Sequence, residues 1–557
     1  MNFNKIKEWF SKKDNLILLG IILFAAIIRI YFFYLTKNQP IWWDESDYLA
    51  YAKTLAGMGS INWIVTSQHN SIFSFILAFF FTINFSEALM KFILEIIPST
   101  IIVILTYLIS RAMYLDKRIA YISAFIMAVF WEGLFNSMRF HVDIPALFFA
   151  FLAIYSFFQG YEKKQKIFSI INPNWAIPLA VIFTIISYSI RRNYLFFGAF
   201  FITYLLITKK YNSLIKDKYN WIGLAIGLLL LLFVELFIFN SSLTSVAGEY
   251  YHPENSFNWK HLSAFSLFFL DGNVFQSIFL WFTYFGLLIV LFNLFFSYDI
   301  LREQKLNDSK SDLFLILSIV ISLSYFIFFQ RGTTIGETRW YYPILLPALI
   351  FISRGILYLG DKINQYKKGL SLIFVLIILS YGGYYQLSHA NQIISEKIPT
   401  YEGIREAGLY LNQVSNVNDV IISVPIPQAA YYSERFVVNP ASLFNRVHND
   451  EVSLEEFISK LEQNNSIKYL LISFSEPNHP SWMRNEQEEY AYDSNGQVIR
   501  AKLEIPFMDT IINFQTGEQK ITQEKTYNDI TFKLIQIKQD VFIYEILRNS
   551  QESPESK

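Results

Sequence analysis

The chain contains no cysteine among its 557 residues. This absence excludes a disulfide, a thiol nucleophile and a thiolate metal site. Charged residues are also scarce, at 17%, where soluble proteins have roughly 25%. Acidic and basic side chains balance to a net charge of zero, which gives no indication of a nucleic-acid partner.

Hydrophobic residues, in contrast, make up 53% of the chain and aromatic residues 18%. This composition predicts a polytopic membrane protein. The first apolar run, residues 15–35, is long enough to cross a bilayer and has no small-residue cleavage pattern, so we expect a membrane anchor. Four lysines precede it (Lys5, Lys7, Lys12 and Lys13), which favours a cytoplasmic N-terminus.

The remaining crossings follow from the rule that basic loops lie on the cytoplasmic side. Five internal basic loops separate the apolar runs into pairs: 111–118, 161–166, 209–218, 301–310 and 354–368. Spans are then expected near 15–35, 89–110, 119–137, 144–160, 175–190, 193–208, 221–240, 276–297, 311–330, 340–357 and 369–386. We therefore predict eleven transmembrane helices, with the C-terminal part outside the cytoplasm.

One apolar run, residues 72–85, is short for a crossing. Counting it as a span would no longer leave all five basic loops on the cytoplasmic side. We interpret it as an interfacial helix in the outer leaflet. The alternative is a short, tilted span, which would turn the basic loop 111–118 outward.

Long apolar runs stop after Tyr385, so we divide the chain into a membrane domain, 1–387, and a soluble domain, 388–557. Helical spacing is found at 401–414, 428–435 and 454–461, and strand patterns at 419–424, 436–438, 468–474, 497–504 and 529–546. The alternation predicts a small α/β domain with a partly parallel sheet. No catalytic motif stands out in it, so we expect it to cover the site or to help bind an acceptor.

Two adjacent carboxylates, Asp44 and Glu45, follow the first span in an Ile-Trp-Trp-Asp-Glu-Ser run. They lie in the first outer loop, 36–70, close to the headgroups. Asp143 recurs at the same depth, between two spans. The alternatives are that the pair is merely solvated and that Asp143 is a helix cap before Ile144 and Pro145.

Positive side chains are expected on the same side of the membrane. Arg191 and Arg192 interrupt an apolar hairpin, and paired arginines at headgroup depth can bind a phosphate. Arg339 begins another span, and His69 begins the interfacial segment. Snorkelling of the arginines and pairing of Arg339 with Glu337 are the alternatives. Together these charges predict a site for an anionic, lipid-linked substrate.

Three motifs resemble the GT-C glycosyltransferases that use polyprenyl-phosphate sugars, in the branch of prokaryotic protein O-mannosyltransferases and aminoarabinose transferases. They are Asp44-Glu45 followed by Tyr48, the run 139–145 that contains Asp143, and Glu337-Thr338-Arg339-Trp340-Tyr341-Tyr342-Pro343. The extension resembles the soluble tail of prokaryotic members. Two positions depart from the family pattern. His69 stands where a lysine or a His-Pro-Pro run is common, and Arg191-Arg192-Asn193 replaces Thr-Lys-Gly.

The resemblance implies an inverting transferase in the plasma membrane, with a polyprenyl-phosphate sugar as donor and an extracytoplasmic protein, lipid or glycan as acceptor. Asp44 would be the general base, with Glu45 and Asp143 orienting the acceptor. Arg191, Arg192, Arg339 and His69 would bind the donor phosphate, and Tyr48, Glu337 and Tyr342 would support the site. Asp44 and Asp143 could share Mg²⁺ or Mn²⁺, which prefer oxygen ligands.

A transporter or flippase for a lipid-linked saccharide is the alternative. It predicts internal repeats and broken helices, and neither stands out in the sequence.

Overall fold

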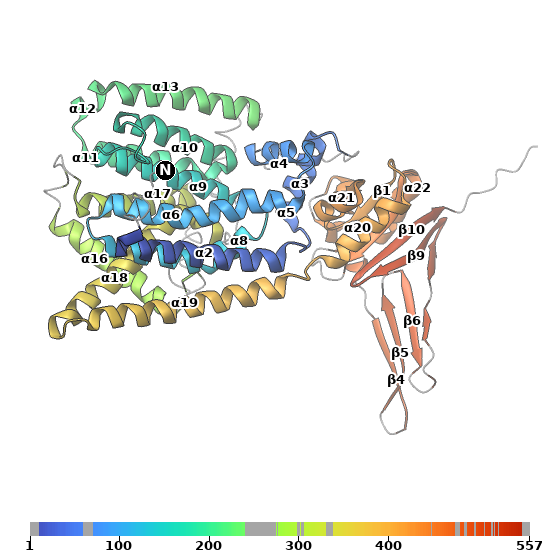
Figure 1. The fold of residues 1–557 in the computed structure, drawn as a ribbon. Helices are drawn as coiled ribbons and strands as arrows, with labels where there is room; N and C mark the ends of the chain where they lie inside the picture. The colour runs from blue at the N-terminus through green and yellow to red at the C-terminus, as the bar shows by residue number, and fades with distance from the viewer. Residues whose placement is uncertain are drawn as a thin grey trace, which may run out of the picture. The chain divides into compact units, whose positions relative to one another are not determined.

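A computed structural model of the chain describes residues 10–58, 71–239, 274–275, 277–297, 301, 306–329, 338–446, 448–473, 479–483, 487–494, 497–505, 507–513, 516, 519–521 and 523–548 (Figure 1). The chain divides into two compact units. The first contains residues 1–38, 70–73 and 85–398, and the second contains 39–69, 74–84 and 399–557. The expected domain boundary at residue 387 stays a prediction.

The first unit is a bundle of mostly apolar helices that includes both long helices and short helical segments (Figure 1). In chain order these are α2 (Lys13–Thr36), α5 (Glu87–Lys91), η2 (Phe92–Ile96), α6 (Ile97–Met113), α7 (Lys117–Val129), α8 (Trp131–Ser137), α9 (Asp143–Ser156), η3 (Phe157–Glu162), η4 (Pro173–Trp175), α10 (Ala176–Ile190), η5 (Arg192–Leu195), α11 (Phe196–Thr208), α12 (Tyr211–Lys216), α13 (Lys218–Phe233), η6 (Val234–Ile238), α16 (Ile278–Phe296), α17 (Asp308–Phe329), η8 (Thr338–Ile344), α18 (Leu345–Tyr366) and α19 (Leu370–Lys397).

Each expected span coincides with a helix or with consecutive helical segments, and the span expected at 119–137 is broken into α7 and α8. Within the described residues, eight helices are long and apolar enough to cross a membrane, or nine if the bent pair α7 and α8 is one span. The segment Arg192–Thr208 is a shorter apolar helix. The structure therefore confirms a polytopic helical protein, and the count of eleven stays a prediction. The run expected to be interfacial forms α4 (Ile72–Thr82), and its place in a membrane also stays a prediction.

A buried arginine stabilises the break between α7 and α8, which are bent by 51°. Arg29 of α2 is fully buried. Its guanidinium donates to the Ser99 hydroxyl at 2.7 Å, to the Ala128 carbonyl at 3.1 Å and to the Met127 carbonyl at 3.4 Å. These carbonyls end α7, where the break removes their helical partners, so Arg29 satisfies backbone groups that the lipid could not.

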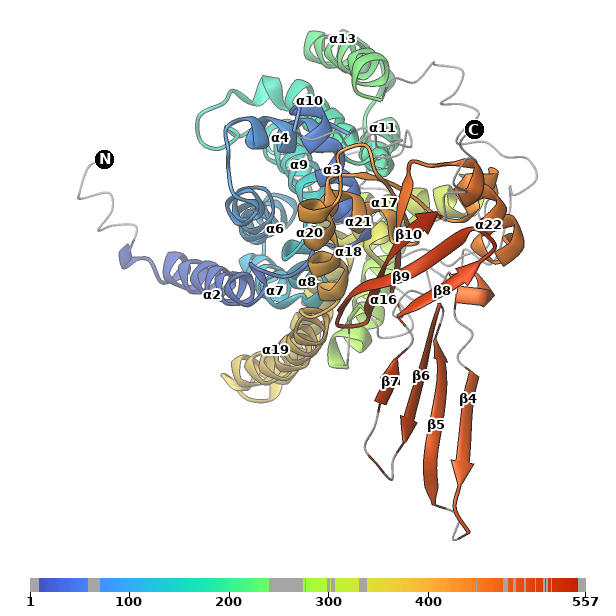
Figure 2. The same ribbon diagram turned by 90° about the vertical axis from the view of Figure 1, so that its right-hand side faces the viewer.

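The second unit is built on a six-stranded sheet with the order β2-β1-β3-β10-β9-β8. Figure 2 shows β8, β9 and β10 of this sheet. β1 (Val420–Ser423) pairs in parallel with β2 (Phe436–Val438) and β3 (Ile467–Ser473), whereas β8 (Glu524–Tyr527), β9 (Ile530–Lys538) and β10 (Val541–Arg548) are antiparallel. A second, antiparallel sheet contains β4 (Gln487–Tyr492), β5 (Val498–Ile505), β6 (Met508–Asn513) and β7 (Gln519–Ile521). The expected α/β fold is confirmed.

Helices cover both faces of the larger sheet. α20 (Glu402–Val414) and α21 (Ile426–Ser433) form one apolar core with β1, β3 and β10. α22 (Leu454–Gln463) forms the other. The Trp-Trp-Asp-Glu-Ser segment is also in this unit, as α3 (Trp43–Leu55), which packs on α21.

Candidate functional site

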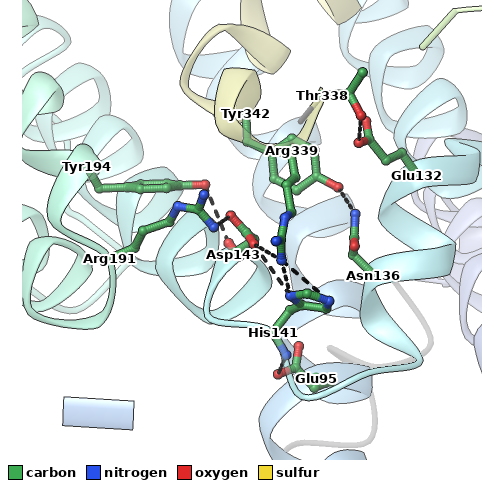
Figure 3. A network of polar contacts seen from close by, with 10 residues as sticks. All are labelled: Glu95, Glu132, Asn136, His141, Asp143, Arg191, Tyr194, Thr338, Arg339 and Tyr342. Carbon is green, nitrogen blue, oxygen red and sulfur yellow. Dashed lines mark hydrogen bonds and ion pairs between the residues drawn. The ribbon is translucent and has the colours of Figure 1, made fainter. Parts of the chain in front are cut away.

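The candidate site of the first unit is centred on Asp143, whose side chain is completely buried at the start of α9. Arg191, directly after α10, forms an ion pair with one carboxylate oxygen. Arg339, in η8, places a guanidinium nitrogen 3.6 Å from the other oxygen. Figure 3 shows both guanidinium groups pointing toward Asp143 from different helices. The structure thus brings together three residues that the sequence predicted.

His141 completes the cluster. Its Nδ1 lies 3.9 Å from the Asp143 carboxylate and is hydrogen-bonded to Arg339. Burial, and then the positive charge of Arg339, lowers the pKa of His141 well below its ordinary value. The imidazole is therefore neutral near pH 7 and accepts a hydrogen bond from the guanidinium. The backbone N–H of His141 donates to Glu95 at 3.1 Å, which fixes the corner before α9.

The bend after α7 positions the segment that carries Arg339. α8 leaves the axis of α7 and presents two polar side chains to η8 (Figure 3). Glu132 accepts a hydrogen bond from the Thr338 hydroxyl, and the Asn136 amide donates to the Tyr342 hydroxyl at 2.6 Å. These contacts hold η8 on both sides of Arg339. Tyr342 is buried and supports the site through this contact.

The structure begins α9 at Asp143 and places Val142 before the helix. The alternative role of Asp143 as a helix cap stays a prediction. Its charge in the first turn of α9 still interacts favourably with the positive end of the helix dipole.

The other predicted phosphate-binding residues are placed differently. Arg192 lies with its guanidinium carbon 4.2 Å from the centre of the Phe239 ring, a cation–π contact. His69 and Glu337 lie outside the described residues. Their roles stay predictions.

The predicted carboxylates Asp44 and Glu45 occupy the first turn of α3 in the second unit. Glu45 and Tyr48 are buried, while Asp44 is partly exposed. One turn further on, burial and then the charge of Asp44 raise the pKa of Asp47 to about 7. Because Asp44 and Asp143 belong to different units, a shared site stays a prediction.

Sequence analysis missed the residues that hold this cluster, namely Glu95, Glu132, Asn136 and His141. A signal for three of them was available. Glu95 and Glu132 are ionisable residues inside expected spans, where burial of charge is costly, and Asn136 follows Glu132 by one helical turn. His141 lies within the run that carried the prediction for Asp143, and nothing in its spacing indicated the contact with Arg339.

A divalent cation does not fit the Asp143 cluster. One carboxylate oxygen is bound by Arg191 and the other faces Arg339, so a cation there would meet two positive groups. Among the described residues, no three histidine, aspartate or glutamate side chains gather as metal ligands.

Residues 68–236 match the family model described as dolichyl-phosphate-mannose-protein mannosyltransferase. A search of curated proteins found no match. Among solved structures, the oligosaccharyltransferase of Archaeoglobus fulgidus, tethered to an acceptor peptide, superposes with a TM-score of 0.56 at 12% identity, over 89% of this chain and 75% of that one. Another structure of that enzyme contains Zn and sulfate.

ArnT from Cupriavidus metallidurans, bound to undecaprenyl phosphate, superposes with a TM-score of 0.53 at 8% identity, over 86% of this chain and 97% of that one. These likenesses show the fold. The family match over residues 68–236 supports a glycosyltransferase that uses a polyprenyl-phosphate-linked sugar. The transporter alternative is not favoured. The prediction of a multi-pass membrane glycosyltransferase with the GT-C fold is therefore confirmed.

Proposed function

We propose that this glycosyltransferase moves a sugar from a polyprenyl-phosphate donor to an acceptor on the extracytoplasmic side of the plasma membrane. The observation that carries the proposal is the buried Asp143 carboxylate held between Arg191 and Arg339. The family match and the likeness to a structure bound to undecaprenyl phosphate support the class of donor.

The cluster suits a phosphate because its charge is positive and its geometry is fixed. Two guanidinium groups, one carboxylate and a neutral imidazole leave a net charge of about +1. Guanidinium groups bind phosphate oxygens through paired N–H donors, and each arginine has donors beyond those that face Asp143. We assign Asp143 the role of orienting the two arginines, in place of the acceptor-orienting role expected from the sequence.

The reaction is a single displacement at the anomeric carbon. A hydroxyl or amine of the acceptor forms the new bond, and the bond between that carbon and the phosphate oxygen breaks. The electron pair leaves with the phosphate, which gains one negative charge. Arg191 and Arg339 stabilise that charge as it develops. Asp44 takes the acceptor proton, and one attack without a covalent sugar–enzyme intermediate inverts the anomeric configuration.

Glu45 and Tyr48 support Asp44 from the same helix, whose first two turns carry all three. If a divalent cation such as Mg²⁺ or Mn²⁺ takes part, we propose Asp44 rather than Asp143 as its ligand, because Asp143 is bound by arginine. The orientation that follows from the basic loops places the N-terminus in the cytoplasm and residues 388–557 outside it.

The test is transfer of radiolabel from polyprenyl-phosphate sugars to a membrane extract by the purified protein in lipid. Arg191→Lys and Arg339→Lys keep the charge and lose the paired donors, so we expect each to lower the transfer rate by about 10² to 10³. Arg192→Lys is the matched control, because Arg192 lies beside Arg191 in sequence but contacts Phe239, and it should stay within about threefold of wild type.

Equal effects of all three substitutions would overturn the assignment of the phosphate to the Asp143 cluster. A folded wild-type protein that transfers no common sugar would overturn the proposed donor class.

A further inference from the structure

A polar cavity lies at the other end of the helix that begins with Asp143. α9 continues through η3 to Glu162, a helical segment of 20 residues. At 1.5 Å per residue it is about 30 Å long, which equals the thickness of the hydrocarbon core of a bilayer. A cavity of about 1030 Å³ opens at the Glu162 end and is lined by Lys163, Lys164, Lys209 and Lys210.

The charges in this cavity are only partly compensated within the described residues. Lys209 pairs with Glu162 at 2.7 Å, and Lys163 donates to the backbone carbonyl of Arg111. The Nζ of Lys164 lies 4.4 Å from the centre of the Tyr161 ring. Lys210 is exposed and forms no ion pair with a described residue.

Burial and then the charge of Arg111 lower the pKa of Lys163. Burial and then the charge of Lys209 lower the pKa of Lys164, although Asp217 and Glu162 act in the opposite direction. Each ammonium group is therefore poorly solvated and lies close to another cation. Asp217 and Asp308 also line the cavity. Together with Glu162 they give three carboxylates for the four lysines. A bound anion would relieve the crowding of the lysines.

An apolar groove adjoins the cavity. It has a volume of about 460 Å³ and lies between α10, α11 and α13, with Leu205 and Leu228 among its walls. Tyr161 of the cavity stacks on Phe157 of the groove, with ring centres 5.4 Å apart, so the two hollows lie side by side. The short helix α12 lines both, with Leu214 in the groove and Ser213 in the cavity.

We propose that this pair of hollows binds an anionic glycerophospholipid, with its phosphate among the lysines and an acyl chain in the groove. A basic pocket between helices at one membrane face, continued by an apolar groove, matches the two parts of such a lipid. The rule that cytoplasmic loops are rich in lysine would explain why these loops are basic. It would not explain why their lysines line one cavity beside an apolar groove. The proposal does not depend on the transfer reaction, because the site is at the opposite end of α9 from Asp143.

The test is native mass spectrometry of the delipidated full-length protein in a neutral detergent. The protein is titrated with phosphatidylglycerol and, in parallel, with phosphatidylcholine of the same acyl chains. We expect one phosphatidylglycerol to bind at least tenfold more tightly than phosphatidylcholine. The double variant Lys163→Gln/Lys164→Gln should weaken phosphatidylglycerol by about fivefold per lysine and leave phosphatidylcholine unchanged. Lys216→Gln is the control, since Lys216 is on α12 but outside the cavity.

The groove is tested separately at Gly198, which lines it and has open space where a side chain would begin. Gly198→Phe should fill the groove and weaken both lipids, whereas Gly198→Ala should weaken neither. Equal binding of the two lipids to wild type, or a double lysine variant that binds like wild type, would overturn the proposal. If inorganic phosphate displaces the lipid and Gly198→Phe has no effect, the site takes a soluble phosphate, and the lipid is the wrong occupant.

Discussion

Replacement of Asp143 by Asn separates two roles that a buried carboxylate could have in this site. Asn has nearly the same shape and can still accept a hydrogen bond from one arginine, but it removes the negative charge between Arg191 and Arg339. If Asp143 orients the arginines and competes with the phosphate for them, the variant should transfer more slowly and bind the phosphate product more tightly.

The expected size follows from the charges. The net charge of the cluster rises from about +1 to about +2. One added unit charge at roughly 5 Å from the phosphate is worth about 1 kcal/mol with the screening of water and about 3 kcal/mol at an effective dielectric constant of 20. This corresponds to product binding that is about fivefold to a hundredfold tighter. Loss of the arginine orientation should reduce the transfer rate by about 10²-fold, the effect of a misplacement of roughly 1 Å.

The assay measures the transfer rate at saturating donor and the inhibition constant of added polyprenyl phosphate, for wild type, Asp143→Asn and Arg192→Lys. Thermal unfolding in detergent reports whether each variant is folded. A folded Asp143→Asn protein with an inhibition constant higher than that of wild type would refute the electrostatic reasoning. A wild-type rate would refute the orienting role.

Three further predictions concern Asp44, Asp47 and Arg29. Asp44→Asn should abolish transfer while thermal unfolding stays like that of wild type, and wild-type turnover would contradict its role as base. Because the pKa of Asp47 is raised in the folded protein, the folded protein loses stability as the pH rises from about 4 to about 7. Asp47→Asn should therefore stabilise the protein by up to about 4 kcal/mol at pH 8 and by little at pH 4. Thermal unfolding at the two pH values measures this difference. Arg29→Met leaves the Ser99 hydroxyl and the end of α7 without their donor, and should lower the unfolding free energy by about 2–4 kcal/mol, whereas a melting temperature equal to that of wild type would argue against the contacts.

The helices and the strands β1, β2, β3, β5, β9 and β10 could be predicted because strong local patterns specify them, whereas β4, β6, β7 and β8 were not predicted. Apolar runs of about 20 residues between basic loops coincide with helices, and the strand expected at 468–474 is β3, Ile467–Ser473. The break between α7 and α8 could not be predicted. No proline is present there, and the break is stabilised by Arg29, about 100 residues earlier in the chain. Only tertiary contact decides where that helix ends.

The candidate site was predictable in its charges but not in its contacts. Asp143, Arg191 and Arg339 were identified because ionisable residues at membrane depth are rare and costly. The sequence could not separate Arg191 from its neighbour Arg192. The structure does so, because Arg191 forms an ion pair with the Asp143 carboxylate, while Arg192 lies over Phe239. A tight turn between two helices directs adjacent side chains to different sides, and no periodicity predicts which side faces the carboxylate.

The C-terminal extension has a more specific role in the second unit than its lack of catalytic motifs indicates. The helix that carries Asp44 is held by side chains of the extension on each side. The backbone N–H of Ile41 donates to the Tyr432 hydroxyl at 2.9 Å, and the Trp43 indole donates to the Tyr401 hydroxyl at 2.9 Å. Lys53, at the far end of α3, pairs with Glu434 at 3.0 Å. A general base must be placed to within a fraction of an ångström. If Asp44 is the base, as we propose, the extension would contribute to the reaction by positioning α3.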